Sequence, residues 1–320
     1  MLRVKFLTFV LLLLTSNFLS AQIIIDDFTD ATNDRFTNDP TFIGAGRDFS
    51  GVGRGDGLID TDTGLEVTTQ VRWGTLLSRN VVITANHFPA GPVNPNQTNS
   101  ISFYRNNDSS DSVVRNLVSG QRLGNSDLFL SVLDAPVPAD FQVYDFARGS
   151  ISADPFDEDT NNTLQPAVTD DGLSLEGEIA YLFGVSPTVR PDADTRFDQA
   201  VGQNRISGYL EDIAVNGPDN DLLVLIRDAR SDPNYVTHEA RFVAGDSGAP
   251  LFIDVGGELQ LLGTNSVVST AGTVFSGIAY IGNHAAEIDA FIAANAIPEP
   301  ASGTLIGILS CVVLMRRKRN

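Results

Sequence analysis

FVAGDSGAPLF, residues 242–252, places one serine between two glycines and then runs directly into an apolar segment. Asp246 precedes this serine, and Pro250 follows it by three residues. Gly, Asp, Ser and Pro are the common residues of tight turns, so the stretch predicts a turn that leads into a strand. Glycines on both sides of Ser247 also allow the backbone to approach something closely. The rest of the chain has to decide between an ordinary turn and a site at Ser247.

The N-terminal end is typical of a targeting segment. Residues 1–21, MLRVKFLTFVLLLLTSNFLSA, carry two positive charges, a short apolar run and then small and polar residues. This pattern predicts a secretory signal peptide that is cleaved after Ala21. A membrane anchor is the weaker interpretation, because the apolar run is too short to span a bilayer.

The C-terminal tail, residues 296–320, holds a Pro-Glu-Pro, an apolar stretch over 301–315 and a basic cluster over 316–319. The tail resembles the PEP-CTERM sorting signal of Gram-negative bacteria, which holds an exported protein in the inner membrane until an exosortase-like protease removes it. The resemblance implies a transmembrane helix, although the apolar stretch is shorter than the about 20 residues of a comfortable span. It also implies that the mature protein is displayed on the cell surface or secreted. A plain C-terminal anchor is the alternative.

Charge and cysteine content limit the function of the part between these ends. The formal charge of the whole chain is −19; without Arg3 and Lys5, and without the tail's net +3, it is −24. Such acidity argues against nucleic acid or an anionic membrane as a partner. The single cysteine, Cys311, lies in the tail, so the mature part has no internal disulfide, no thiolate metal site and no cysteine nucleophile.

Short strand-like runs separated by Gly, Pro, Asn and Asp follow a loosely structured arm over residues 22–41. At least ten such runs predict an antiparallel, all-β sandwich or barrel. Only HAAEIDAFIAAN, residues 284–295, has a helical pattern, with Ala286, Ile288, Phe291 and Ile292 near one face. The runs cover residues 70–78, 80–86, 100–105, 128–133, 141–147, 178–185, 204–210, 221–226, 249–255, 259–269 and 277–282.

A serine hydroxyl becomes a nucleophile only beside a base, which is usually a histidine oriented by a carboxylate. The chain has three histidines, of which His87 follows a strand-like run, whereas His284 opens the terminal helix and is most simply a surface residue. Asp127 stands at the start of the apolar run LFLSVL, where an unpaired charge is unfavourable unless a partner accepts it. A strand-edge cap is the other interpretation of Asp127.

Three segments together resemble trypsin-like serine proteases: WGTLLSRNVVITANHF (73–88), NSDLFLSVLDAPV (125–137) and VAGDSGAPLF (243–252). They occur in that family's order of His, Asp and Ser. The resemblance implies a protease domain over residues 42–295, built of two antiparallel six-stranded β-barrels, about 42–145 and 146–295, with a short C-terminal helix.

The resemblance also implies roles for individual residues. His87, Asp127 and Ser247 would be the catalytic triad of a serine endopeptidase that acts through an acyl-enzyme. The backbone N–H groups of Gly245 and Ser247 would form the oxyanion hole. LQLLGTNSVVS, residues 259–269, resembles the strand that pairs with the bound peptide, beginning at Ser266.

Specificity and activation follow the family less closely. The residue six before the nucleophile is Arg241, which disfavours basic side chains in the specificity pocket, whereas Val268, in place of a glycine, points to a narrowed pocket and small side chains. Phe88 replaces a cysteine and is expected to pack in the first barrel. Asp246 often pairs in the family with a new N-terminus, for which cleavage before Ile43 is the nearest candidate.

Other functions remain open from the sequence. A protease-like module with a silent triad, which binds at the cell surface, is the main alternative, and an esterase is a third possibility. The expected partner is a peptide or protein substrate of a monomeric enzyme, and the chemistry needs no cofactor. Calcium could bind at two Asp-rich loops, through Asp154, Asp157 and Asp159 or through Asp192 and Asp194, but neither has an EF-hand spacing, and solvated loop charge is favoured.

Overall fold

The first part of the chain forms a closed antiparallel barrel. The computed structural model describes residues 22–55, 59–60, 62, 72–91, 97–105, 107–108, 110–151, 163–188, 198–215, 219–270 and 272–296. The strands pair in the order β2-β4-β5-β8-β7-β6, and a further pairing of β6 with β2 closes a ring of six strands. A short β3 extends the edge of β6. The bounds are β2 Val52–Gly55, β3 Ile59–Asp60, β4 Arg72–Ser78, β5 Val81–Ala85, β6 Gln97–Tyr104, β7 Ser112–Arg122 and β8 Leu128–Leu133.

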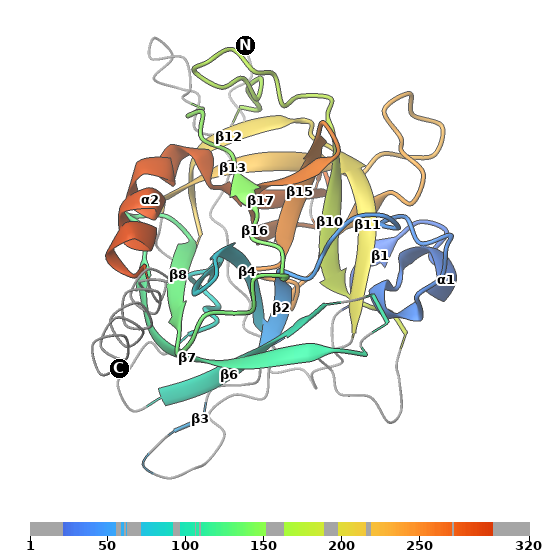
Figure 1. The fold of residues 1–320 in the computed structure, drawn as a ribbon. Helices are drawn as coiled ribbons and strands as arrows, with labels where there is room; N and C mark the ends of the chain where they lie inside the picture. Colours follow the sequence, from blue (N-terminus) through green and yellow to red (C-terminus); the bar gives the residue numbers. More distant parts are fainter. Residues whose placement is uncertain are drawn as a thin grey trace, which may run out of the picture.

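The second part of the chain forms a separate antiparallel sheet in the order β11-β10-β15-β16-β17-β13-β12 (Figure 1). A two-residue β9 adds to β16 in parallel, and no ladder joins the end strands β11 and β12 within the described residues. The bounds are β9 Asp145–Phe146, β10 Ile179–Val185, β11 Gln199–Arg205, β12 Gly208–Ala214, β13 Asp219–Ile226, β15 Pro250–Val255, β16 Glu258–Ser269 and β17 Phe275–Tyr280. The predicted all-β class is confirmed, and the two sheets are consistent with a trypsin-like double barrel.

One apolar core connects the two sheets. Trp73 on β4 is fully buried, and its ring meets Phe183 on β10 edge-on at a centroid distance of 6.4 Å. Phe183 also packs edge-on against Phe49, at 4.9 Å, and Tyr144 lies 4.6 Å from Phe252 on β15. Aromatic pairs of this geometry add to the stabilisation from burial. The core therefore fixes the position of the first barrel relative to the second sheet.

The N-terminal arm is not loosely structured, contrary to the sequence-based prediction. β1 (Ile24–Ile25) pairs antiparallel with β14 (Ala240–Arg241), and α1 (Asp30–Asn33) and a 3-10 turn (Arg35–Thr37) follow it. Arg35 is fully buried and donates to the carbonyl oxygens of Val52 and Tyr104 and to Gln199 Oε1. These acceptors belong to both sheets, so the arm connects the two halves.

The C-terminal helix α2 (Ala285–Ala294) follows a 3-10 turn, Gly282–His284. Ile288 is buried, and Phe291 and Ile292 pack against the core as predicted, whereas Ala286 is exposed. The Asn80 amide, between β4 and β5, donates to the Asn295 carbonyl at 2.6 Å, so the helix reaches the first barrel.

No helix in the part of the chain that the structure describes is long and apolar enough to cross a membrane. This finding contradicts the predicted transmembrane helix. The apolar stretch for which it was predicted, residues 301–315, lies outside the described residues, as does the signal peptide, residues 1–21.

Candidate active site

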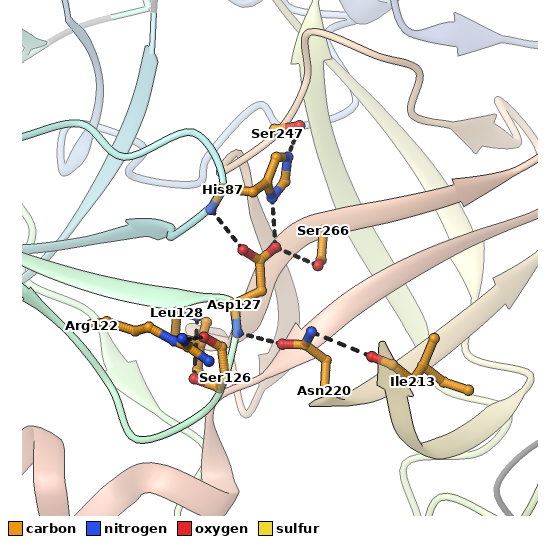
Figure 2. Close-up of polar contacts among 9 residues, drawn as sticks. All are labelled: His87, Arg122, Ser126, Asp127, Leu128, Ile213, Asn220, Ser247 and Ser266. Atoms are coloured by element: carbon orange, nitrogen blue, oxygen red, sulfur yellow. Dashed lines mark hydrogen bonds and ion pairs between the residues drawn. The ribbon is translucent and has the colours of Figure 1, made fainter. Parts of the chain in front are cut away.

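His87, Asp127 and Ser247 meet between the two sheets (Figure 2). The His87 ring bridges the other two side chains: its Nε2 lies 2.8 Å from Ser247 Oγ, and its Nδ1 lies 2.6 Å from Asp127 Oδ2. The His87 backbone N–H also donates to Asp127 Oδ1, at 2.7 Å. The histidine side chain is 17% exposed and the aspartate side chain is fully buried. This is the geometry in which a histidine can take a proton from a serine while a carboxylate orients the ring.

A tight turn before β8 positions Asp127. Ser126 donates its hydroxyl to the Leu123 carbonyl at 2.7 Å, and the Leu128 N–H donates back to the same hydroxyl at 3.2 Å. The second sheet also reaches Asp127, because Ser266 on β16 donates its hydroxyl to Asp127 Oδ2 at 2.5 Å. A buried carboxylate is costly unless such donors satisfy it, and here three donors do. Asp127 is thus a partnered buried group rather than a strand-edge cap.

The glycine after Ser247 is required by the approach of β5. Gly248 has φ +85°, and a Cβ at this position would lie 2.6 Å from Thr84 Oγ1 and 3.1 Å from the Ala85 nitrogen. Any larger residue would therefore push the serine turn away from the strand that leads to His87. The close approach that the two glycines suggested is thus, at Gly248, an approach to the protein's own β5.

The Ser247 turn is pinned from two sides. Asp246 is fully buried, and its carboxylate accepts the Val185 N–H at 2.6 Å and the Val243 N–H at 2.9 Å. On β16, the Asn265 carbonyl accepts the Gly248 N–H at 2.9 Å, and the Asn265 amide donates to the Asp246 carbonyl at 3.2 Å. Sequence reasoning missed Asn265, because an asparagine within a strand gives no signal of the turn that it holds.

The two predicted oxyanion donors make no hydrogen bond to the described part of the protein. Neither the Gly245 N–H nor the Ser247 N–H donates a hydrogen bond to any described residue. Gly245 is exposed and has φ +106°, a conformation that favours glycine. Among the described residues, both N–H groups are thus left without a hydrogen-bond acceptor.

The far end of β16 offers a backbone edge next to the same turn. β15 pairs with β16 only as far as Thr264, and no described strand continues along that edge over residues 266–268, whereas β17 covers the opposite edge. The Ser266 side chain itself is taken up by Asp127. Val268 is partly buried, packs against the core and pairs with Ser276.

Arg241, the predicted pocket residue, lies on β14, where its backbone pairs with Ile24 of the arm. Its Nε is buried and has no hydrogen-bond partner among the described residues. Burial, and then the charge of Arg227, lower the pKa of Arg241 from its usual value. The Arg241 side chain is thus partly buried, and it forms no ion pair within the part of the chain that the structure describes.

In the N-terminal arm, Ile23 rather than Ile43 lies near Asp246. A Cβ on Gly184 would touch both Ile23 Cβ, at 2.6 Å, and the Asp246 carboxyl carbon, at 2.8 Å. The Ile43 N–H instead bonds the Thr32 carbonyl at 2.9 Å, next to α1. Burial raises the pKa of Asp246 to about 7, because the carboxylate loses its hydration.

Several smaller predictions can also be placed. Phe88 lies under the guanidinium of Arg72, at 4.2 Å from ring centroid to Cζ. His284 lies near the surface and pairs with Glu287 at 3.2 Å. The calcium candidates Asp154, Asp157, Asp159, Asp192 and Asp194 all lie outside the described residues, and no cluster of potential metal ligands occurs within the described ones.

No protein-family model matches the chain, and no curated protein matches it. Among solved structures, a mutant of human heparin binding protein is 14% identical, with a TM-score of 0.47, over 79% of this chain and 95% of that one. An inactivated protease paralogue of the scabies mite is 13% identical, with a TM-score of 0.45, over 78% and 95%. Human heparin binding protein is 13% identical, with a TM-score of 0.44, over 79% and 95%.

Proposed function

We propose that the protein is an exported serine endopeptidase that cleaves peptide bonds with Ser247, His87 and Asp127. The observation that carries this proposal is the His87 ring, which lies within hydrogen-bond distance of Ser247 on one side and of the buried Asp127 on the other. If the Ser247 turn resembled a protease turn only by chance, there would be no reason to bury the Asp127 carboxylate, which comes from the first barrel, next to it.

The reaction has two half-steps. Ser247 Oγ attacks the peptide carbonyl carbon as His87 Nε2 takes the hydroxyl proton, and the carbonyl oxygen becomes an oxyanion next to the Gly245 and Ser247 N–H groups. Collapse of this intermediate breaks the C–N bond, and His87 gives the proton to the departing amine. Water then attacks the carbonyl carbon of the acyl-enzyme while His87 takes a proton from the water. The ester bond to Ser247 Oγ breaks, and His87 returns the proton to this oxygen. One oxyanion donor is typically worth about 3 kcal/mol of the barrier.

A peptide is favoured over a small ester by the edge of β16 beside Ser247. An extended peptide can add as a strand along residues 266–268, because β15 pairs with β16 only up to Thr264 and no other described strand pairs with these three residues on that side. A simple ester has too few backbone groups to use such an edge. In the pocket, Arg241 favours acidic and Val268 favours small side chains, so neither residue supports cleavage after Lys or Arg.

Labelling by a fluorophosphonate probe, mapped by mass spectrometry, tests the proposal. We expect stoichiometric modification at Ser247 in the wild type and none in Ser247→Ala or His87→Ala. His284→Ala is the matched control, because this histidine pairs with Glu287 and touches no triad atom, and it should label like the wild type. A folded wild type that does not label would favour the alternative, a silent protease-like binding module.

The route of the chain through the cell is also a proposal. The signal peptide at residues 1–21 supports export, and the Pro-Glu-Pro tail at 296–320 supports processing by an exosortase-like protease, which leaves the enzyme on the cell surface or secreted. We expect a monomer. Mass spectrometry of the protein from its native cells tests both ends: termini at Gln22 and near residue 297 are expected, and an intact tail would contradict the sorting proposal.

A further inference from the structure

Asn220 on β13 contacts the backbone of Asp127, at the side away from His87 (Figure 2). The Asp127 backbone N–H donates to Asn220 Oδ1, and both residues are fully buried. This contact joins the second sheet to the first residue before β8 of the first barrel. The Asp127 carbonyl is also held, since it accepts the Asn86 N–H at 2.7 Å. Both backbone polar groups of Asp127 are therefore fixed.

An irregularity in the second sheet fixes Asn220 in turn. The pairing of β12 with β13 shifts register between Leu210 and Ile213, and Asp212 within this bulge has φ +53°. Ile213 then stands opposite Asn220, and its carbonyl accepts the Asn220 amide at 3.4 Å. β-bulges commonly re-aim a side chain near a functional site. Here the bulge places the Ile213 carbonyl where it can orient the amide.

We propose that Asn220 is a positioning residue, which sets the place of Asp127 and through it the orientation of the His87 ring. The proposal rests on the proposed triad but assigns a role to a residue outside it, which contacts the main chain of Asp127. Ser266 on β16 holds the carboxylate of Asp127, whereas Asn220 on β13 holds its main chain, so two strands of the second sheet fix the two ends of one residue. Without Asn220, the Asp127 N–H is buried and unsatisfied, and the residue tilts to find another acceptor.

Asn220→Leu removes the acceptor at similar size, and Asn204→Leu is the matched control. Asn204 is also a fully buried asparagine of the second sheet, but its amide donates to the Ala240 carbonyl at 2.8 Å, away from the triad. We expect both variants to lose stability. We expect only Asn220→Leu to lose reaction rate, by about tenfold to a hundredfold in probe labelling or kcat, with KM unchanged, because a shift of about 1 Å has effects of this size.

Proton NMR gives a readout that does not depend on activity. The proton between His87 Nδ1 and Asp127 Oδ2 resonates far downfield while the bond is short. This signal should weaken or move in Asn220→Leu and stay in Asn204→Leu. If the wild type fails to label with the probe, the proposed function fails, yet the signal still tests Asn220 in the folded protein.

Asn220→Asp serves if the leucine variant does not fold. It keeps an oxygen for the Asp127 N–H and should therefore retain the downfield signal. An unchanged signal and rate in Asn220→Leu would overturn the proposal. So would a loss in Asn204→Leu as large as that in Asn220→Leu, or a complete loss of the signal in Asn220→Asp.

Discussion

Gly248→Ala should separate the Ser247 turn from β5 and thereby slow the reaction. The new Cβ would lie 2.6 Å from Thr84 Oγ1 and 3.1 Å from the Ala85 nitrogen, whereas ordinary contact begins near 3.4 Å. The contact with the Ala85 backbone asks for a movement of roughly 0.3 Å and the contact with Thr84 Oγ1 for roughly 0.8 Å; Thr84 is fully buried, so the turn moves rather than the threonine side chain. The left-handed φ of +85° adds about 1 to 2 kcal/mol of strain.

The displacement bears directly on the bond between Ser247 and His87. Their atoms lie 2.8 Å apart, so a shift of nearly 1 Å takes the serine hydroxyl out of hydrogen-bond distance. We expect fluorophosphonate labelling at Ser247 to slow by about a hundredfold. The assay is the second-order rate of labelling, followed by mass spectrometry, with the melting temperature measured beside it.

Gly256→Ala separates strain from displacement. Gly256 lies in the turn between β15 and β16 with φ +65°, and a Cβ there meets nothing within 4 Å. This control should lose similar stability from strain but keep the labelling rate. Wild-type labelling by Gly248→Ala would refute the reasoning, because it would mean that contact with β5 does not place Ser247.

Three other perturbations follow from the same contacts. Burial raises the pKa of Asp246 from 3.8 to about 7, so the folded state holds this proton more tightly than the unfolded chain. The stability that it contributes is complete below about pH 4 and is lost as pH rises through 7; urea unfolding should show a loss of about 3 kcal/mol between about pH 5 and about pH 8 that is absent in Asp246→Asn. Arg35→Ala leaves buried acceptors in both sheets unpaired and should lower the free energy of unfolding by about 3 to 5 kcal/mol, whereas Arg148→Ala, at a surface ion pair, should change it by less than about 1. Ser266→Ala removes one donor to the buried Asp127 and should slow probe labelling by about tenfold and lower the free energy of unfolding by about 1 to 3 kcal/mol; an unchanged rate would mean that the remaining donors hold the carboxylate alone.

The runs of apolar residues predicted the strands whose side chains face the core. They did not predict strands with mostly exposed side chains or with small residues at close backbone contacts. β7 reads SVVRNLVSGQR and was missed, because most of its side chains are exposed or half-buried around a barrel that other strands fill. β11 reads QAVGQNR, and the predicted run over residues 204–210 overlaps only its last two residues. Gly202 is needed in this strand because a Cβ there would lie 2.3 Å from the Ala240 side chain. Such reasons lie in the neighbouring strand and not in the local sequence.

The N-terminal arm was predicted incorrectly for a related reason. Its two-residue strand pairs with Arg241 and Ala240, more than 200 residues away in the chain, and its buried Arg35 looks like a surface charge in the sequence. The residues proposed for the triad were identifiable because their chemistry demands particular residue types in a recognisable order. Asn220 was not, because an amide that holds a backbone N–H needs no neighbouring motif.

Cleavage of a mixed peptide library by the mature protein, read as new termini by mass spectrometry, tests the proposed function most directly. The wild type should generate new termini, and Ser247→Ala, which leaves the fold and the β16 edge in place, should generate none. Equal cleavage by both proteins would contradict the role of Ser247. An uncut library together with an unlabelled Ser247 in folded wild-type protein would contradict the endopeptidase itself.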